Sequence, residues 1–265
     1  MRERDGQERD GKSAIRSFYD QMAPQYDKLF LDWSESVREQ AALLDRVFRE
    51  NGFGPGARVL DCACGIGTQA IGLAALGYEV TGSDLSAGAL AEAERRAAQA
   101  QVPLRLAQAD FCSLQTAFSE RFDIVIAMDN ALPHMLTREA LESAVGSICA
   151  RLAPGGLFAA SIRDYDRLLE EKPRCSVPYI HRTANGQRVS FQTWDWTGDR
   201  YHFIQYIIDD EGAPQLGKFE CDYRALRREE LSGLLTAEGC REPRWLSPEE
   251  SGYYQPVVIA RKREK

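Results

Sequence analysis

A regular alternation of short apolar runs with longer helical patterns constrains the fold of this chain more than any other feature. The apolar runs predict strands at residues 58–61, 78–83, 104–108, 122–127 and 156–162, and the amphipathic patterns between them predict helices at 68–76, 87–100 and 138–152. Strands that alternate with helices form a parallel sheet covered on both faces, because the connections between parallel strands are right-handed. The pattern therefore predicts an α/β fold with a doubly wound, mostly parallel sheet.

The segments on either side of this alternation have different patterns. Two helical segments precede it, and the second, at about 34–50, gathers its apolar residues on one face. After residue 166 the period changes to two, and Thr197-Gly198-Asp199 separates two strand-like runs as a hairpin turn would. We therefore expect four parts: a disordered tail over 1–12, an N-terminal helical lid over 13–50, a Rossmann-like core over 51–165 and 225–265, and an antiparallel insertion over 166–224 that caps the substrate site.

The net charge and the composition argue against several classes of binding partner. The chain carries 33 Lys and Arg against 40 Asp and Glu, a net charge of −7, whereas a phosphate backbone needs a positive footprint. No run approaches the roughly 18 apolar residues of a membrane helix, and the polar N-terminus lacks the apolar core of a secretory signal. The seven cysteines form no C-x-x-C pair, which favours reduced thiols and no metal site. We expect a cytoplasmic protein that binds neither nucleic acid nor a membrane; the sequence leaves its oligomeric state open.

A Gly-rich turn follows the first predicted strand and precedes a helix. This turn, residues 61–67 with the sequence DCACGIG, lets the backbone approach a ligand closely and exposes the free amides of the helix start. Asp84 follows the second strand, where a carboxylate can accept hydrogen bonds from both hydroxyls of a ribose. Asp110 and Phe111 follow the third strand, where they can bind and stack on an adenine. Open α/β sheets bind their ligands at these carboxyl ends of the strands.

Two cofactors compete for this arrangement. Gly65, Gly67 and Ala70 fit the spacing of the dinucleotide fingerprint, in which the last glycine can be Ala. Asp61, however, stands four residues before the first glycine, where it would bind an amino group rather than face a pyrophosphate. Three acidic strand ends match a ligand with an amino-acid head, a ribose and an adenine. The residues therefore favour S-adenosylmethionine over NAD.

Several motifs resemble those of a known family. The stretches VLDCACGIGTQAIGLA (59–74), GSDLS (82–86) and AQADF (107–111) resemble motifs of the class I S-adenosylmethionine-dependent methyltransferases. Within that group the chain is similar to glycine/sarcosine N-methyltransferases, in its segments FYDQMAPQYDKLF, MDNALPHM and RDYD. The resemblance implies a Rossmann-like, mostly parallel sheet of seven strands with an antiparallel insertion. It departs from the family at Cys62 and Cys64, positions that are often small or apolar.

The resemblance also implies roles for individual residues. Residues that would bind the cofactor are Asp61, Gly65 and Gly67 at its methionine part, Asp84 at the ribose, and Leu85, Asp110 and Phe111 at the adenine. Other cofactor residues would be Met128 and Asn130 on the floor near the sulfonium, and Trp33 and Arg38 closing on the cofactor carboxylate. His134 would share that floor, and the lid would contribute Tyr19 and Tyr26.

The chemistry of methyl transfer suggests what these residues would do. The sulfonium methyl is already electrophilic, so the enzyme must hold the acceptor in line with it and exclude water. An amine acceptor must be deprotonated, and His134 is one candidate base, while the hydroxyls of Tyr19 and Tyr26 could orient the acceptor. Arg163, with Arg174 and Arg182 nearby in sequence, is a candidate for binding a substrate carboxylate. We expect methylation of the nitrogen of a small amine or amino acid.

Alternatives remain at the sequence level. Cys62, Cys64, Cys175 and Cys221 raise the possibility of a soft acceptor, a thiol or a trivalent arsenical, because thiolates bind soft atoms. A cofactor-binding module without catalysis is another. Some side chains of the insertion can be either part of the site or structural, and these are Trp194, Trp196, Tyr201, Tyr206, His181 and His202.

Overall fold

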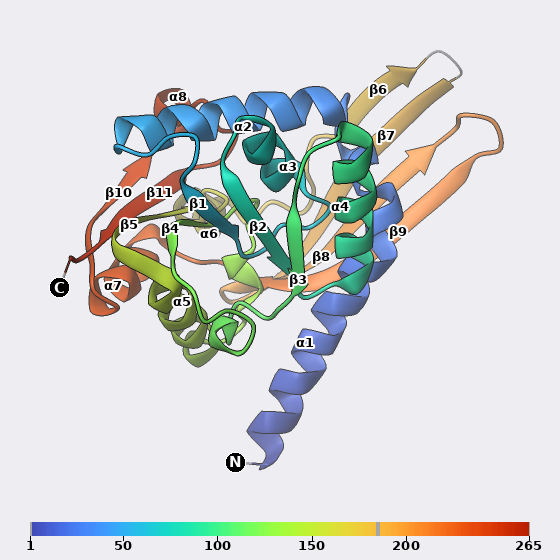
Figure 1. Cartoon of the computed structure of the whole chain (residues 1–265). Helices are drawn as coiled ribbons and strands as arrows, with labels where there is room; N and C mark the ends of the chain where they lie inside the picture. Colours follow the sequence, from blue (N-terminus) through green and yellow to red (C-terminus); the bar gives the residue numbers. More distant parts are fainter. Residues whose placement is uncertain (1, 184–185, 265) are drawn as a thin grey trace.

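The computed structural model describes residues 2–183 and 186–264, and its centre is a seven-stranded sheet (Figure 1). The strand order is β10-β11-β5-β4-β1-β2-β3. The parallel strands are β1 (Arg58–Asp61), β2 (Glu79–Asp84), β3 (Arg105–Gln108), β4 (Phe122–Ala127) and β5 (Leu152–Ser161). The antiparallel strands are β10 (Cys240–Leu246) and β11 (Val257–Lys262). The predicted α/β fold with a mostly parallel, seven-stranded sheet is confirmed.

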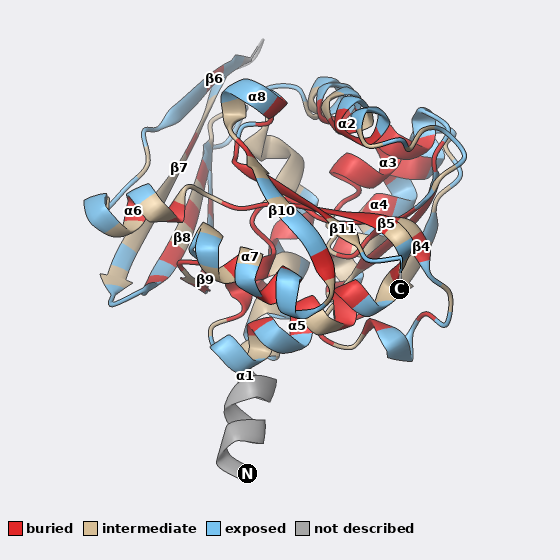
Figure 2. Ribbon diagram, turned by 90° about the vertical axis from the view of Figure 1, so that its left-hand side faces the viewer, coloured by how far each residue is buried: buried red, intermediate tan, exposed pale blue. Residues whose placement is uncertain are grey.

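Helices cover both faces of this sheet. One face packs against α2 (Trp33–Glu50) and α3 (Thr68–Ala75), and the other packs against α5 (Arg138–Arg151) and α7 (Arg228–Ala237). Neighbouring residues of a strand point to opposite faces, so Val59 packs with α2 and α3 while Leu60 packs with α5 and α7. Figure 2 shows the buried strands between helices whose outer faces are exposed. Helix α4 (Ala87–Ala100) follows β2, and Ser86 caps it by accepting from Ala89 N.

The Gly-rich turn has the shape that the sequence predicted. Gly67 has φ 91° and precedes the first residue of α3, and a Cβ atom there would lie 2.8 Å from the Cδ1 atom of Ile71. Only glycine combines that backbone conformation with such close packing. The turn therefore brings the start of α3 directly against the carboxyl end of β1.

The insertion forms a second, antiparallel sheet. Its strands are β6 (Tyr179–Thr183), β7 (Gly186–Thr197), β8 (Arg200–Asp209) and β9 (Gln215–Arg224), in that order. The predicted hairpin turn joins β7 to β8, where Thr197 pairs with Arg200. Side chains that follow β4 and β5 contact this sheet, since His134 packs on Tyr223 and Arg163 bonds to Tyr201. The second sheet therefore lies at the carboxyl ends of the parallel strands.

The N-terminal segment is helical where the sequence predicted a disordered tail. Helix α1 spans Arg2–Met22 and is followed by the 3-10 helix η1 (Ala23–Leu29). Residue 1 lies outside the described residues. The apolar pattern begins only at Ile15, but the Arg, Glu and Lys residues before it favour a helix even without an apolar stripe. Phe18 and Met22 are buried, and the Phe18 ring lies 6.2 Å from that of Phe203 on β8.

None of the described helices is long and apolar enough to cross a membrane. Four short elements complete the described chain. They are η2 (Leu114–Thr116), η3 (Leu132–His134), α6 (Tyr165–Glu171) and α8 (Pro248–Ser251). Helix α6, strand β6 and strand β10 were not predicted from the sequence.

Candidate active site

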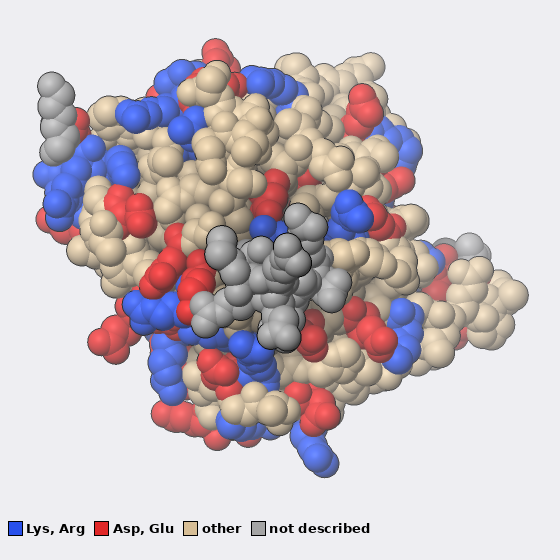
Figure 3. Space-filling model, turned by 90° about the horizontal axis from the view of Figure 1, so that it is seen from below, with Lys and Arg blue, Asp and Glu red and all other residues tan. Residues whose placement is uncertain are grey.

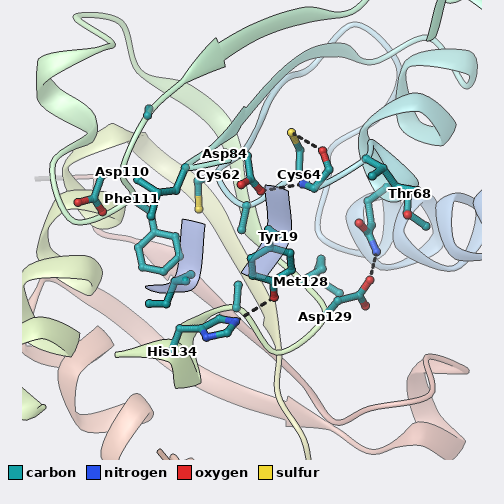
Figure 4. Close-up of a pocket in the computed structure, with 18 of the residues that line it drawn as sticks. Tyr19, Cys62, Cys64, Thr68, Asp84, Asp110, Phe111, Met128, Asp129 and His134 are labelled. Atoms are coloured by element: carbon teal, nitrogen blue, oxygen red, sulfur yellow. Dashed lines mark hydrogen bonds between the residues drawn. The ribbon is translucent and has the colours of Figure 1, made fainter. Parts of the chain in front are cut away.

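A cavity at the carboxyl ends of β1 to β4 collects most of the residues singled out from the sequence. Those that line it are Tyr19, Tyr26, Gly65, Asp84, Leu85, Asp110, Phe111, Met128 and His134. The lining also includes Lys12 and Ile15 of α1, so the N-terminal helix forms one wall. Figure 4 shows Asp110 and Phe111 at one end of this cavity, Thr68 and Asp129 at the other, and Asp84 and Tyr19 between them.

Asp84 stands at the middle of the cavity, fixed by backbone donors. Its Oδ2 atom accepts from Gly65 N at 2.8 Å, and its Oδ1 atom accepts from Ser86 N at 2.9 Å. Burial raises the pKa of this carboxyl, while the backbone hydrogen bonds oppose that rise. The turn at Gly65 and the cap at Ser86 thus hold the Asp84 carboxylate in one orientation at the cavity wall.

An ion pair between Lys12 of α1 and Asp110 lies at one end of the cavity, where Figure 4 shows Asp110. Lys12 Nζ lies 2.8 Å from Asp110 Oδ2, and Cys112 N donates to Asp110 Oδ1 at 2.8 Å. Phe111 lines the cavity beside this pair. A carboxylate next to an aromatic ring at the end of β3 has the chemistry required to bind an adenine.

Asp61 and Gly67 lie behind the cavity wall rather than on it. The Asp61 side chain is 0% exposed, its Oδ1 accepts from Ala63 N at 3.4 Å, and its Oδ2 has no hydrogen-bond partner among the described residues. Burial raises the pKa of Asp61 to about 8. The carboxyl is therefore mostly neutral at pH 7.

The two residues expected at the cofactor carboxylate are placed differently. Trp33 Nε1 donates to Thr68 Oγ1 at 3.1 Å, and Thr68 itself lines the cavity. The guanidinium of Arg96 stacks on the Trp33 ring, 4.4 Å from its centre. Arg38 is exposed and does not line the cavity. Trp33 thus acts on the cavity through Thr68, whereas Arg38 contributes nothing to its wall.

Tyr19 and His134 form a hydrogen-bonded pair on the floor. The Tyr19 hydroxyl lies 2.9 Å from His134 Nε2 (Figure 4). The ring of Tyr223 packs against the imidazole, with 4.2 Å between the ring centres. Burial lowers the pKa of His134 to about 3, so the imidazole is neutral at pH 7. Burial also raises the pKa values of Tyr19 and Tyr26, so both hydroxyls keep their protons.

A second polar group lies beside the floor and beneath the antiparallel sheet, and none of its five residues lines the cavity. We call it the Arg163 cluster, and it consists of Asn130, Arg163, Tyr165, Gln192 and Tyr201. Arg163 donates to Tyr201 OH at 3.1 Å and to Gln192 Oε1 at 2.9 Å. Asn130 Oδ1 accepts from Arg163 N and from Tyr165 OH, at 3.1 and 3.0 Å. In the part of the chain that the structure describes, Asn130 Nδ2 is buried without a partner and no carboxylate pairs with Arg163.

Other candidates of the insertion are structural or exposed. Tyr201 is 1% exposed and stacks on Tyr223, and Trp196 Nε1 donates to Pro173 O. Trp194 lies under the Arg163 guanidinium, 5.0 Å from it, so it contributes to both the sheet and the cluster. Residues that lie outside the cavity lining are His181, His202, Arg174, Arg182 and Tyr206.

The cysteines do not form a thiolate site. Cys62 and Cys64 line the cavity, but burial raises their pKa values well above the ordinary range. Cys175 is exposed, Cys221 is buried, and neither lines the cavity. Within residues 2–183 and 186–264, no three His, Cys, Asp or Glu side chains are grouped to hold a metal ion.

Sequence reasoning missed Asp129, which also lines the cavity. It accepts hydrogen bonds from Gln69, Tyr253 and Tyr254. The available signal was its position two residues after the end of β4, which makes it a further acidic residue that follows a strand of the sheet.

Comparison with known proteins identifies the family. Residues 59–156 match the family model described as "Methyltransferase domain". Glycine N-methyltransferase of Rattus norvegicus is 30% identical over 213 residues, which cover 72% of this chain and 71% of that protein. This chain belongs to the S-adenosylmethionine-dependent methyltransferases. Its cofactor is S-adenosylmethionine, and the methyltransferase is an enzyme rather than a cofactor-binding module alone.

Further relatives of the methyltransferase extend the likeness beyond that domain. Glycine/sarcosine N-methyltransferase of Aphanothece halophytica is 23% identical over 247 residues, 93% of this chain and 88% of that protein. The enzyme of the same name from Parasynechococcus marenigrum is 30% identical over 155 residues, but the match spans only 54% of its length and 58% of this chain.

Solved structures share the fold. A methyltransferase of Clostridium acetobutylicum superimposes with a TM-score of 0.73 at 18% identity, covering 92% of this chain and 99% of that one. The sugar N-methyltransferase KedS8 of Streptoalloteichus sp. gives 0.70 at 22% identity, covering 87% and 90%. The residues of the cavity fit the cofactor, because a fixed carboxylate, a Gly-rich turn and an aromatic strand end follow one another along its wall.

Proposed function

We propose that this methyltransferase methylates the nitrogen of a small amine that also carries a carboxylate, such as an amino acid. The observation that carries the proposal is the Arg163 cluster. Its guanidinium is enclosed by neutral hydroxyl, amide and aromatic groups, with no carboxylate of the described chain to balance its charge. Arg163 is half-buried, and a cation placed there without an ionic partner is costly, so a ligand carboxylate would reduce that cost through two parallel hydrogen bonds.

The cluster adjoins the cofactor cavity. Asn130 is two residues after Met128, which lines that cavity, and its unpartnered Nδ2 group is a second donor for the same carboxylate. A small acceptor held by Arg163 and Asn130 would place its amino group toward the floor formed by Tyr19 and His134. S-adenosylmethionine, when bound, supplies the electrophilic methyl group.

The floor residues orient the acceptor rather than deprotonate it. An imidazole with a pKa of about 3 cannot take a proton from an ammonium group whose pKa is about 8 or above. We therefore expect the amine to enter as its neutral form, with the proton lost to solvent. The hydroxyl oxygens of Tyr19 and Tyr26 then accept hydrogen bonds from the amine N–H groups, which leaves the nitrogen lone pair free and in line, and the surrounding apolar walls exclude water.

We propose further that residues 13–50 act as a lid and residues 166–224 as the substrate cap. Tyr19 and Tyr26 reach the cavity from the first segment, and Gln192 and Tyr201 reach Arg163 from the second. The described parts of the face in Figure 3 carry Lys and Arg residues interspersed with Asp and Glu, unlike the basic stripe that a nucleic acid requires. This pattern supports a small-molecule acceptor.

The names of the relatives also support nitrogen as the acceptor atom. Both glycine/sarcosine N-methyltransferases and a sugar N-methyltransferase are among the similar proteins. No observation favours the soft-acceptor alternative, since the cysteines that motivated it are neutral thiols or lie away from the cavity.

A matched pair of acceptors tests the proposal. Steady-state kinetics would compare an amino acid with the amine that lacks its carboxylate, for the wild type and for Arg163→Lys. The wild type should strongly prefer the amino acid, and the variant should raise its KM by about 10- to 100-fold, because Lys cannot make the paired hydrogen bonds. Equal use of the two acceptors by the wild type would contradict a carboxylate-binding role.

A further inference from the structure

Asp129 is held in an unusual backbone conformation that points its side chain into the cofactor cavity. Its φ is 56° and that of Asn130 is 68°, a left-handed region that residues other than glycine seldom adopt. Ser161 holds both, since its Oγ atom accepts from Asp129 N at 2.8 Å and its carbonyl accepts from Asn130 N at 3.0 Å. Strain of this kind persists where the surrounding structure requires a side chain in one place.

Three neutral donors fix the carboxylate in that place. Gln69 Nε2 donates to Oδ2 at 2.8 Å, Tyr254 OH donates to Oδ1 at 2.9 Å, and Tyr253 OH donates to the same oxygen. Gln69 also bonds to Gln40, so the donors themselves are held. No Lys, Arg or His of the described chain forms an ion pair with Asp129. The arrangement is a rigid carboxylate that faces a cavity and has no cation of its own.

The position of Asp129 indicates which part of the cofactor it faces. Asp110 and Phe111 lie at one end of the cavity, where we place the adenine, and Asp84 lies in the middle, where we place the ribose (Figure 4). Asp129 lies at the other end, beside Thr68 and Gln69 at the start of α3. The amino-acid part of the cofactor must extend to this end, where the free amides of α3 attract its carboxylate. Its ammonium group then lies next to the remaining charged side chain, that of Asp129.

We propose that Asp129 binds the α-ammonium group of the methionine part of S-adenosylmethionine. Asp61, the residue that the sequence suggested for this role, is fully enclosed behind the wall. Asp129 does not bind the acceptor amine, because a carboxylate beside that nitrogen would stabilise its protonated ammonium form and so block attack on the methyl group. The inference goes beyond the proposed acceptor and depends only on the cofactor.

Calorimetry without any acceptor tests the assignment. S-adenosylhomocysteine and its analogue that lacks the α-amino group would be titrated into the wild type and Asp129→Asn. The variant should bind S-adenosylhomocysteine about 10- to 100-fold more weakly, because a hydrogen bond between charged groups is lost. It should bind the desamino analogue as the wild type does, or more tightly.

Two controls make the result specific. Asp110→Asn, at the adenine end, should weaken both ligands by the same factor. Tyr254→Phe removes one donor to Asp129 and keeps its charge, so it should change the affinity for S-adenosylhomocysteine only a few-fold. An equal loss of both ligands in Asp129→Asn would overturn the proposal, as would unchanged binding of S-adenosylhomocysteine together with a raised KM for the acceptor, which would assign Asp129 to the acceptor instead.

Discussion

At the scale of single residues, Asp84 lies at the middle of the cofactor cavity. Gly65 N and Ser86 N hold its carboxylate at 2.8 and 2.9 Å. We expect Asp84→Asn to weaken S-adenosylhomocysteine binding by about 1.5–3 kcal/mol, because the hydrogen bonds that the ribose hydroxyls donate to a charged carboxylate are lost. Calorimetric titration measures this directly. Glu79→Gln, at the exposed start of the same strand, is the control and should bind normally; an Asp84→Asn variant that matched it would contradict the role of Asp84.

The buried carboxyl of Asp61 should make stability depend on pH. Its pKa is raised from 3.8 to about 8, so the native state keeps a proton that the unfolded chain releases. The stability from this group is present in full below about pH 4 and is lost as the pH rises through about 8. Urea unfolding at about pH 5 and about pH 9 should show a smaller loss for Asp61→Asn than for the wild type.

Asp123 provides the matched control for that experiment. The hydrogen bond from Arg58 lowers its pKa, so its contribution is already complete above about pH 4 and stays constant over the same range. Asp123→Asn should therefore lower stability without changing its dependence on pH. The interpretation of Asp61 would be wrong if Asp61→Asn lost stability with pH as steeply as the wild type.

Site residues whose position follows from a local sequence motif could be predicted. Site residues whose orientation depends on contacts with distant segments could not. Asp84, Asp110 and Gly65 could be predicted because each lies at or within four residues of the carboxyl end of a strand, and parallel strands end at one edge. Asp129 also follows a strand, but its orientation depends on a left-handed backbone and on donors from α3 and from the segment before β11. No local pattern encodes contacts between residues so distant in sequence.

At the scale of elements, Asp20 connects α1 to the start of α4, next to the cofactor site. Asp20 Oδ1 accepts from Ser86 Oγ at 2.6 Å and from Gly88 N at 2.9 Å, and a Cβ atom at Gly88 would lie 3.1 Å from that oxygen. Asp20→Ala should release the helix and so increase the rate of proteolysis within α1 several-fold. It should also weaken cofactor binding, since Ser86 positions Asp84.

Gln21 offers a control on the same helix. Its side chain is exposed and bonds only to Ser17 among the described residues, so Gln21→Ala should leave both proteolysis and affinity unchanged. Proteolysis of Asp20→Ala at the rate of the wild type, with and without S-adenosylhomocysteine, would show that α1 is held by its apolar packing alone.

The elements that sequence analysis missed share a weak pattern. Strand β10 contains Pro243 and three charged residues, and its pairing with β11 shifts register between Arg241 and Arg244. Strand β6 lies at an edge, where Tyr179 and Ile180 are exposed. Edge strands need not alternate between apolar and polar residues, so periodicity cannot reveal them. The central strands, buried on both faces, were correspondingly clear.

At the scale of the whole molecule, the cofactor should stabilise the fold as a unit. The cavity draws on α1, the carboxyl ends of the four parallel strands β1 to β4, and η3, so ligand binding connects segments from the whole first half of the chain. S-adenosylhomocysteine at about 100 times its Kd should add about 2.7 kcal/mol to the free energy of unfolding, which corresponds to a rise in Tm of roughly 5–10 °C. Differential scanning fluorimetry would detect it. NADH at the same concentration should produce no rise, and a larger effect of NADH would contradict the assignment of the cofactor.

The central claim is that the methyl group passes to the nitrogen of a carboxylated amine. The most direct test is to incubate the enzyme with S-adenosylmethionine labelled with ¹³C at the methyl group, together with amino acids, plain amines, thiols and arsenicals, and to locate the label by mass spectrometry and NMR. The account predicts a label attached to the nitrogen of an amino acid, with most of that product lost in Arg163→Lys. A label attached to sulfur, arsenic or oxygen, or an N-methylated product formed equally well by Arg163→Lys, would contradict it.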